Sequence, residues 1–461
     1  LEPLSQEDVL KLFERHLGAD IVTKEQEYFK KIGELLGNLP LAVAIAARQM
    51  AIEPDWTSQK YLKRIQSDTR LDRLSFGDRS VRRSFNPSYD SLTPTQQRFF
   101  AALGIFKGDD FSVKATAVTF NIASQGAEDL LRALYTRSLV QQAQPGRYYL
   151  HPLLRDYAQE IPCDKDIYER MVIYFTQFIE EHSRDYDELE SEAKNIFGAL
   201  DTAIELGMSE KFVHGANTIF DFLELKGYYA RAEVYLQQAQ KIAENLDDIH
   251  SLVKTLLNSA TISEKQGQLD RAEAYCHQGI SIAQQKGNEL LLTRFYQVLG
   301  VTAENRGDYE KAAEYSRKGL TLAQKLNLPG IKSTLLSNLG SVEANKGNYI
   351  QAEKYMRESL EIAQRLGLHE NVCLLLINLG VTAGRRGDYA QEKENYEKAL
   401  DLAQKYGFLE NESLVLMDLG VLALEQEQFD LAEEHLRESL QIARKIGHQE
   451  SPMKGAIAIP N

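Results

Sequence analysis

The residues that most often carry enzyme chemistry are present in this chain, but they form no recognisable catalytic or metal-binding motif. The nine histidines show no HxxxH or HExxH spacing, so a metal site is not expected. Cys163, Cys276 and Cys373 lie far apart without a CxxC pair, which favours reduced thiols over a disulfide framework. No GxxxxGK[ST] phosphate loop occurs, so the chain is not expected to hydrolyse ATP by itself. These patterns favour a binding protein over an enzyme.

Polar side chains that could bind a ligand recur at a fixed spacing instead. Asn258, Asn338, Asn378 and Asp418 fall in one column with a period of 40 residues, in which Val298 takes the second place. An asparagine amide donates and accepts hydrogen bonds at once, so such a row can hold the backbone of an extended peptide. The alternative is that these side chains form hydrogen bonds within the protein.

The elements that position this column are predicted to be repeated helical pairs. Three further columns keep the 40-residue period: Gly300, Gly340, Gly380 and Gly420; Gly227, Gly267, Gly307, Gly347 and Gly387, with Glu427 in the sixth place; and Ala243, Ala283, Ala323, Ala363, Ala403 and Ala443. Each unit holds two apolar patterns of helical period, joined by a turn such as Gly307-Asp308-Tyr309. This period indicates an α-solenoid, and solenoids usually serve as binding surfaces.

Small residues within the predicted helices indicate close helix packing. Glycine inside a helix costs about 0.5–1 kcal/mol relative to alanine, so the glycines at 300, 340, 380 and 420 require an offsetting contact. The same reasoning applies to a column of alanines in the second helices: Ala232, Ala272, Ala312, Ala352 and Ala432. Glu392 replaces alanine in this column. We expect both columns to lie where two helices touch.

Composition limits the classes of partner and compartment. The 461 residues carry a formal net charge of −14, which argues against non-specific binding to DNA or to anionic membranes. No apolar stretch approaches the ~18–20 residues that span a bilayer, and no signal peptide is visible. We expect a cytoplasmic protein. Because the sequence starts at Leu1 without methionine, we also expect a fragment of a longer protein.

The first 160 residues are not repetitive. Ser5 is a helix N-cap candidate, so a helix is predicted from about Gln6. The segment Gly37-Asn38-Leu39-Pro40-Leu41 indicates a helix end followed by a new helix that starts at the proline. Residues 139–150, with a Pro145-Gly146 turn, predict a hairpin. Together with helices near Leu92-Thr93-Pro94, this order predicts a winged helix.

The repeat units resemble the tetratricopeptide repeat in the 40-residue form found in bacterial regulators and scaffold proteins. The likeness rests on Leu-Gly in the first helix, the Gly-x-Tyr turn and alanine in the second helix, over residues 209–448. It implies that first helices line a concave, ligand-facing side. The residues it assigns to ligand binding are Asn258, Arg294, Gln297, Asn338, Asn378 and Asp418.

The front half resembles STAND signalling ATPases of the NB-ARC type. The motifs are "IGELLGNLPLAVAIAA" and "GRYYLHPLLRDYA". The family's Gly-Leu-Pro-Leu-Ala motif is present with Asn38 inserted, which implies that Pro40 lines the adenine pocket. The family's Met-His-Asp motif corresponds to Leu150-His151-Pro152, which implies that His151 contacts the β-phosphate of ADP at rest. Pro152 replaces the family's aspartate, a departure at the resting-state contact.

The resulting prediction is a mainly α chain in five parts. They are a helical adaptor at 1–72, a winged-helix domain at 78–160, a helical lead-in at 161–208, the tetratricopeptide array at 209–448 and a tail at 449–461. No cofactor is expected in this fragment, whereas the intact parent would bind ADP or ATP with magnesium in a nucleotide domain upstream. The predicted partners are that domain and a protein or peptide ligand in the repeat groove, with an oligomer possible on activation of the parent.

Two other functions remain open at this point. One is a passive tetratricopeptide scaffold, in which the front half is a spacer. The other is a winged-helix transcriptional regulator, for which the arginines before that domain would contact DNA: Arg70, Arg73, Arg79, Arg82 and Arg83. The net negative charge of the chain argues against the transcriptional regulator.

Overall fold

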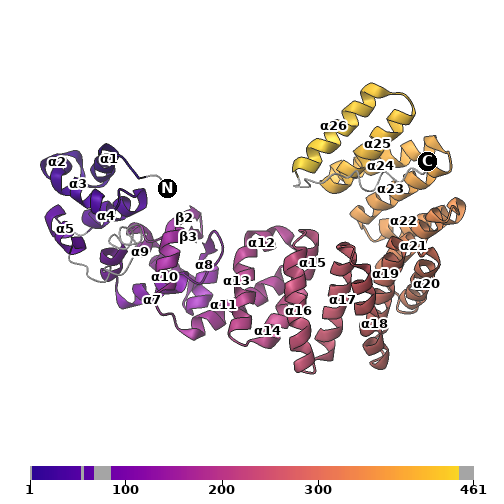
Figure 1. Ribbon diagram of the computed structural model, residues 1–461, viewed down its shortest axis with the longest axis horizontal. Helices are drawn as coiled ribbons and strands as arrows, with labels where there is room; N and C mark the ends of the chain where they lie inside the picture. The colour runs from indigo at the N-terminus through magenta and orange to yellow at the C-terminus, as the bar shows by residue number, and fades with distance from the viewer. Residues whose placement is uncertain (1–2, 53–56, 67–84, 446–461) are drawn as a thin grey trace. The chain divides into compact units, whose positions relative to one another are not determined.

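The computed structural model describes residues 3–52, 57–66 and 85–445 (Figure 1). The chain divides into two compact units, Leu1–Gly227 and Tyr228–Asn461. The arginines between positions 70 and 83, the end of the predicted adaptor and the tail at 449–461 lie outside the described residues.

The first unit opens with a small helical bundle. Its helices are α1 (Gln6–Leu17), α2 (Ala19–Lys24), α3 (Gln26–Leu35), α4 (Pro40–Ile52) and α5 (Ser58–Gln66). The Ser5 side chain accepts from the Asp8 N–H, and α4 begins at Pro40, as the sequence predicts. The bundle encloses an apolar core centred on Phe13, Phe29 and Tyr61.

A second helical group of this unit carries a small sheet. Its elements are α7 (Pro94–Leu103), β1 (Phe111–Ser112), α8 (Val113–Phe120), α9 (Ser124–Thr136), β2 (Gln141–Gln144), β3 (Arg147–Tyr149) and α10 (Pro152–Gln159). The strands are antiparallel in the order β1-β3-β2, with Tyr148 opposite Phe111 on one side and Gln142 on the other. The predicted hairpin is therefore confirmed, and β1 is a strand that the sequence did not indicate.

Helices complete the first unit. They are α11 (Lys165–Glu181), α12 (Tyr186–Ser191), α13 (Ala193–Glu205), α14 (Ser209–Thr218) and α15 (Phe220–Leu225). α11 and α13 pack against α14, and α11 also packs against α8. The segment that follows the sheet is therefore joined to it by helix packing.

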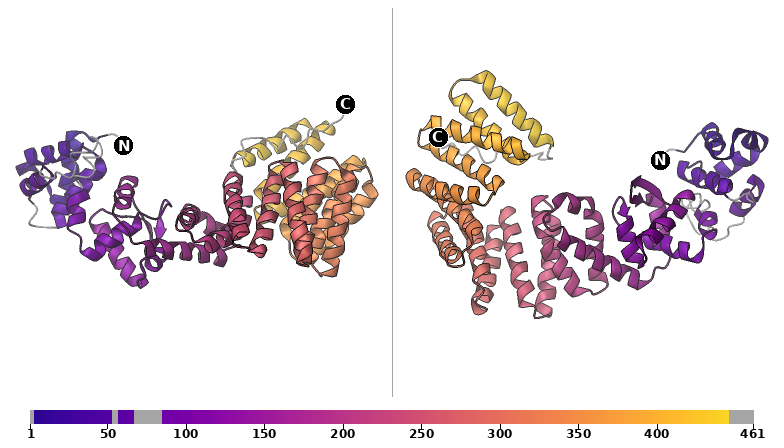
Figure 2. Two further views of the ribbon diagram at one scale, coloured as in Figure 1. Left: turned by 60° about the horizontal axis from the view of Figure 1, so that its bottom comes forward. Right: turned by 180° about the vertical axis from the view of Figure 1, so that it is seen from behind.

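The second unit is a stack of antiparallel helical pairs (Figures 1 and 2). Its helices are α16 (Tyr229–Asn245), α17 (Ile249–Lys265), α18 (Leu269–Gln285), α19 (Glu289–Asn305), α20 (Tyr309–Lys325), α21 (Pro329–Asn345), α22 (Tyr349–Arg365), α23 (His369–Arg385), α24 (Tyr389–Tyr406), α25 (Leu409–Glu425) and α26 (Phe429–Lys445). Each first helix, such as α19, pairs with the second helix that follows it, α20, and packs on the second helix before it, α18.

The columns of small residues occupy the predicted places. Gly307 has φ 79° at the turn between α19 and α20, and the Asp308 side chain caps α20 by accepting from the Lys311 N–H at 3.2 Å. A Cβ added to Gly340 would lie 2.6 Å from Met356 Cγ of the partner helix α22. Ala312 is fully buried. Close helix packing therefore explains both columns, as predicted.

First helices of neighbouring units also contact one another: α17 with α19, α19 with α21, α21 with α23 and α23 with α25. Second helices of neighbouring units are less closely packed. A stack in which one set of helices is drawn together curves towards that set, so the first helices line the inner side of the array. None of the described helices combines the length and apolar character needed to cross a membrane.

Candidate ligand-binding face of the repeat array

The exposed side chains of each first helix fall on a single stripe, because its other sides are covered by neighbouring helices. We call the surface made by these stripes on α17, α19, α21, α23 and α25 the inner face. The sequence-predicted ligand residues all lie on these five helices. The inner face is therefore the candidate site.

The end of the inner face nearest the start of the array is basic. Lys254 on α17 and Arg294 on α19 occupy the same register position and are exposed. Neither forms an ion pair or hydrogen bond with any described residue. Gln297, on the same helix as Arg294, is half-buried. Arg294 and Gln297 are thus open to a partner.

The asparagine column lies deeper. Asn258 is only 7% exposed and interacts within the chain. Asn338 and Asn378 are half-buried on α21 and α23. The Nδ2 of Asn338 is buried and has no hydrogen-bond acceptor among the described residues. An amide donor left without an acceptor costs free energy, so Asn338 would gain a hydrogen bond if its side chain rotated towards a ligand carbonyl.

Asp418 on α25 lies close to the Glu392 carboxyl group and the Tyr396 phenol, at the end of the inner face farthest from Lys254. Burial, followed by the charge of Glu392, raises the pKa of Asp418 to about 7. Burial and the charge of Glu425 raise the pKa of Glu392 to about 7 as well. Glu392 Oε2 is buried without a hydrogen-bond partner in the described chain. Tyr396 packs against Gly380, where an added Cβ would lie 2.4 Å from its ring.

A polar ladder that the sequence analysis missed runs along the ends of the first helices. Asn305 Nδ2 donates to Glu264 Oε1 at 2.8 Å, and Asn345 Nδ2 donates to Glu304 Oε1 at 3.0 Å. Arg385 Nη1 donates to Asn345 Oδ1 at 2.9 Å. Burial raises the pKa of Glu304 to about 7. The sequence did contain a signal for this ladder, because each donor asparagine follows its acceptor glutamate by 41 residues, which is one repeat and one position.

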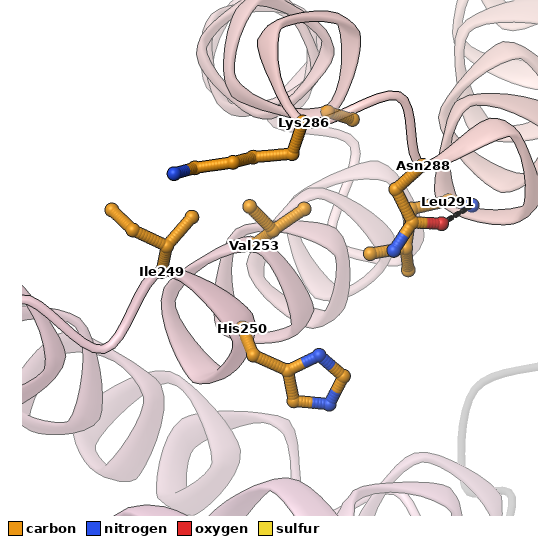
Figure 3. A pocket seen from close by; sticks show the side chains of 7 residues that line it. Ile249, His250, Val253, Lys286, Asn288 and Leu291 are labelled. Carbon is orange, nitrogen blue, oxygen red and sulfur yellow. Dashed lines mark hydrogen bonds between the residues drawn. The ribbon is translucent and has the colours of Figure 1, made fainter.

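A cavity of about 320 Å³ opens where α17, α18 and α19 meet (Figure 3). Apolar side chains of Ile249, Val253 and Leu291 line it, together with His250 and Lys286. Asn288 caps α19 at its edge by accepting from the Leu291 N–H at 3.1 Å. The cavity lies one helical turn from Lys254, because His250 precedes Lys254 by four residues on α17.

The residues predicted to contact nucleotide lie in the first unit. Pro40 is half-buried at the start of α4, and the nearby Asn38 Oδ1 is a buried acceptor with no partner in the described chain. His151 is the N-cap of α10, and its Nδ1 accepts from the Leu153 N–H at 3.3 Å. Burial lowers the pKa of His151, which favours a neutral ring with its proton on Nε2.

A charged network fixes the small sheet to α13. Arg147 of β3 donates to Asp110 Oδ1 and, from Nη1 at 2.6 Å, to Glu192 Oε1. Asn195 Oδ1 accepts from the Gly108 N–H at 2.6 Å. Glu192 is only 3% exposed, and its Oε2 accepts from Asn195 Nδ2 at 2.7 Å. The segment around Asp110 thus joins the sheet to the helices that follow.

Comparisons with known proteins agree with this architecture. Residues 293–326, 332–405 and 393–445 match family models of the tetratricopeptide repeat. The array is therefore built of tetratricopeptide repeats, a class of helical solenoid whose curved surfaces bind partners.

The whole chain is similar in fold to a STAND protein with a tetratricopeptide repeat sensor from Pyrococcus horikoshii. The TM-score is 0.50 at 15% identity, covering 97% of this chain and 70% of that one. Two curated relatives are the regulatory proteins AfsR of Streptomyces griseus, 39% identical over 160 residues, and of Streptomyces coelicolor, 36% identical over 160 residues. Each match covers 34% of this chain and 16% of AfsR. The chain thus shares the fold of a STAND protein with a tetratricopeptide repeat sensor and is similar in sequence to a part of AfsR.

Proposed function

We propose that this chain is the ligand-sensing and regulatory portion of a STAND signal-transduction NTPase of the cytoplasm. In this proposal the repeats bind a protein or peptide, and the helix-and-sheet group of residues 94–159, a winged helix, helps to hold ADP at rest. The observation that carries the proposal is the inner face, a continuous row of first helices with unpaired polar and apolar side chains.

The inner face suits an extended or helical protein segment better than a small metabolite. The polar groups on it without a partner among the described residues, Arg294, Gln297 and the Asn338 amide, are spread over two neighbouring first helices rather than gathered in one pocket. Backbone carbonyls of a bound segment would satisfy such donors in sequence, and side chains on one side of the segment would meet the apolar positions. The nature of tetratricopeptide arrays as binding surfaces supports this assignment.

His151 has the properties that a phosphate contact requires. Its Nδ1 is engaged by the backbone, so a neutral ring presents Nε2–H as a donor, and that donor has no partner among the described residues. Pro40 and the unpartnered Asn38 Oδ1 lie at the segment that would line an adenine pocket. These residues fit a bound nucleotide, which would be held chiefly by a phosphate-loop domain upstream in the parent.

Coupling between the ligand site on the inner face and the proposed nucleotide contact at His151 requires a ligand that binds the ADP-released state of the parent more tightly than the ADP-bound resting state. To change the ratio of released to resting molecules from 1:99 to 99:1, the ligand must bind the released state about 10⁴-fold more tightly than the resting state. Rates of ADP release from the full-length parent test this step. His151→Ala should accelerate release, and the exposed His277→Ala on a second helix should not. Equal rates for His151→Ala and wild type would refute the ADP-holding role.

The two alternatives predict different results. A passive scaffold would bind its ligand without changing ADP release from the parent. A transcriptional regulator would give a salt-dependent gel shift with DNA, whereas the acidic balance of the chain predicts none.

A further inference from the structure

Most basic side chains of the repeat array are neutralised within it. Arg306 pairs with Asp270, Lys346 with Glu310, and Lys325 with Glu289, all between neighbouring units. Lys254 and Arg294 differ, since both are exposed on the inner face and neither is paired with a described residue. Two unpaired cations at the same register of adjacent helices give this end of the face a positive potential in an otherwise acidic chain.

The neighbouring cavity strengthens the basic character of this end. Figure 3 shows the Lys286 side chain extending beside Ile249 at the edge of the cavity. Lys286 also has no ion pair with any described residue. The cavity floor is apolar through Val253 and Leu291. This end therefore offers cations around a space that one apolar side chain can enter.

The opposite end of the inner face is apolar at this register position, although Arg385 on α23 also lies at this end and donates to Asn345 Oδ1. At the register of Lys254 and Arg294, α23 presents Leu374, which is 41% exposed. On α25, Leu414 occupies the same register position and is half-buried. The buried carboxyl groups of Glu392 and Asp418 lie at this end, so an acidic partner residue there would add a like charge. This end favours apolar partner side chains and disfavours acidic ones.

We propose that the partner of this array is an amphipathic protein segment with its acidic residues over α17 and α19 and its apolar residues over α23 and α25. This inference rests on the proposed function, which requires only that the inner face binds a segment. It adds the chemistry of that segment and its placement along the array.

Helix spacing sets the separation between the two parts of the segment. Arg294 and Leu374 are two first-helix steps apart, and packed helices lie about 10 Å from axis to axis, so the distance is about 20 Å. An extended chain advances ~3.3 Å per residue, so about six residues would separate the acidic and apolar groups. A helical segment would need about thirteen residues, because a helix rises 1.5 Å per residue.

Selection from a displayed library of random 16-residue peptides tests the inference on the complete chain. Wild type is compared with the doubly reversed variant Lys254→Glu/Arg294→Glu. The matched control is Lys241→Glu/Lys354→Glu, which reverses two exposed lysines on second helices that likewise lack ion pairs with described residues. Selected peptides are then synthesised and their dissociation constants measured at low and high salt.

The expected result is enrichment of peptides with acidic residues at one end and apolar residues at the other. These should bind Lys254→Glu/Arg294→Glu at least about tenfold more weakly at low salt, with a smaller difference at high salt. The control variant should bind like wild type. Unchanged thermal melting of both variants shows that the loss is not unfolding.

Two other outcomes overturn the inference in different ways. Enriched peptides that are neutral or basic, or that bind the two variants equally, refute the proposed chemistry while leaving peptide binding intact. Failure to enrich any peptide on wild type refutes the binding function itself, and the inference with it.

Discussion

The structure predicts how much the charge of Glu392 lowers the stability of the fold. It occupies a column that is alanine in the other repeats, and it projects towards Gly384, where an added Cβ would lie 2.5 Å from Glu392 Oε1. Its Oε2 has no partner among the described residues. The unfavourable burial of this carboxylate is the reason that its pKa rises to about 7.

The direction of the pH dependence follows from that shift. A carboxyl group whose pKa is higher in the folded state than in the unfolded state holds its proton more tightly when folded. Stability therefore falls as pH rises from the unfolded pKa, 4.5, to the folded value of about 7, and the full penalty remains above it. A shift of about 2.5 pKa units corresponds to roughly 3 kcal/mol at most. Because Glu392 is half-buried and coupled to Asp418, we expect about 1–2 kcal/mol.

The perturbation is Glu392→Gln, which keeps the shape and removes the charge. At pH 8 it should stabilise α24 and α25 by about 1–2 kcal/mol, and below pH 4.5 it should have almost no effect. Hydrogen exchange of peptides from residues 389–425, corrected for the pH dependence of intrinsic exchange, measures the local free energy. Glu394→Gln is the control, because the exposed Glu394 pairs with Lys398 and should give no gain at pH 8. A wild-type-minus-variant difference that does not change with pH would refute the reasoning.

Three further predictions follow from the packing and the polar groups. Ala312→Leu should destabilise the array by about 1–3 kcal/mol through overpacking of a fully buried site, and an unchanged thermal melt would contradict this. Arg147→Met should cost about 3–5 kcal/mol because it leaves the buried carboxylate of Glu192 unpaired; urea denaturation checks it, and a loss of less than 1 kcal/mol would argue against the network. Asn338→Ala should weaken a peptide selected on this chain, whereas equal affinity by fluorescence anisotropy would remove Asn338 from the site.

The periodic part of the fold could be predicted from the sequence because each repeat has the same residue types at its turn and at its helix contacts. Gly307 recurs where positive φ is needed, and Gly340 recurs where Met356 of the partner helix leaves no room for a side chain. Glu427 shows that the backbone can keep φ 60° at this turn without glycine, once the stack holds it in place.

The remaining features depend on contacts between distant residues. α2 ends at Lys24, where Ser58 donates to the Glu25 carboxylate, and α3 begins at Gln26. The predicted helical lead-in at 161–208 contains three helices, α11, α12 and α13. The second case arises where Glu192, between α12 and α13, turns inward to meet Arg147. Neither break has a proline or glycine signal.

The candidate site was predictable in position but only partly in chemistry. The 40-residue columns placed Arg294, Gln297 and Asn338 on the inner face by periodicity and family likeness. The sequence did not show that Asn258 is buried or that Asp418 and Glu392 share an acidic cluster. Glu392 was visible as a break in the alanine column, and its proximity to Asp418 comes from packing of α24 against α25.

Hydrogen exchange of the complete chain, with and without a peptide selected on it, tests the central claim that the inner face is a receptor surface. The account predicts slower exchange in the first helices α17, α19, α21, α23 and α25, with little change in the second helices α18, α20, α22 and α24. Slower exchange confined to the second helices, or to residues 1–227, would contradict it.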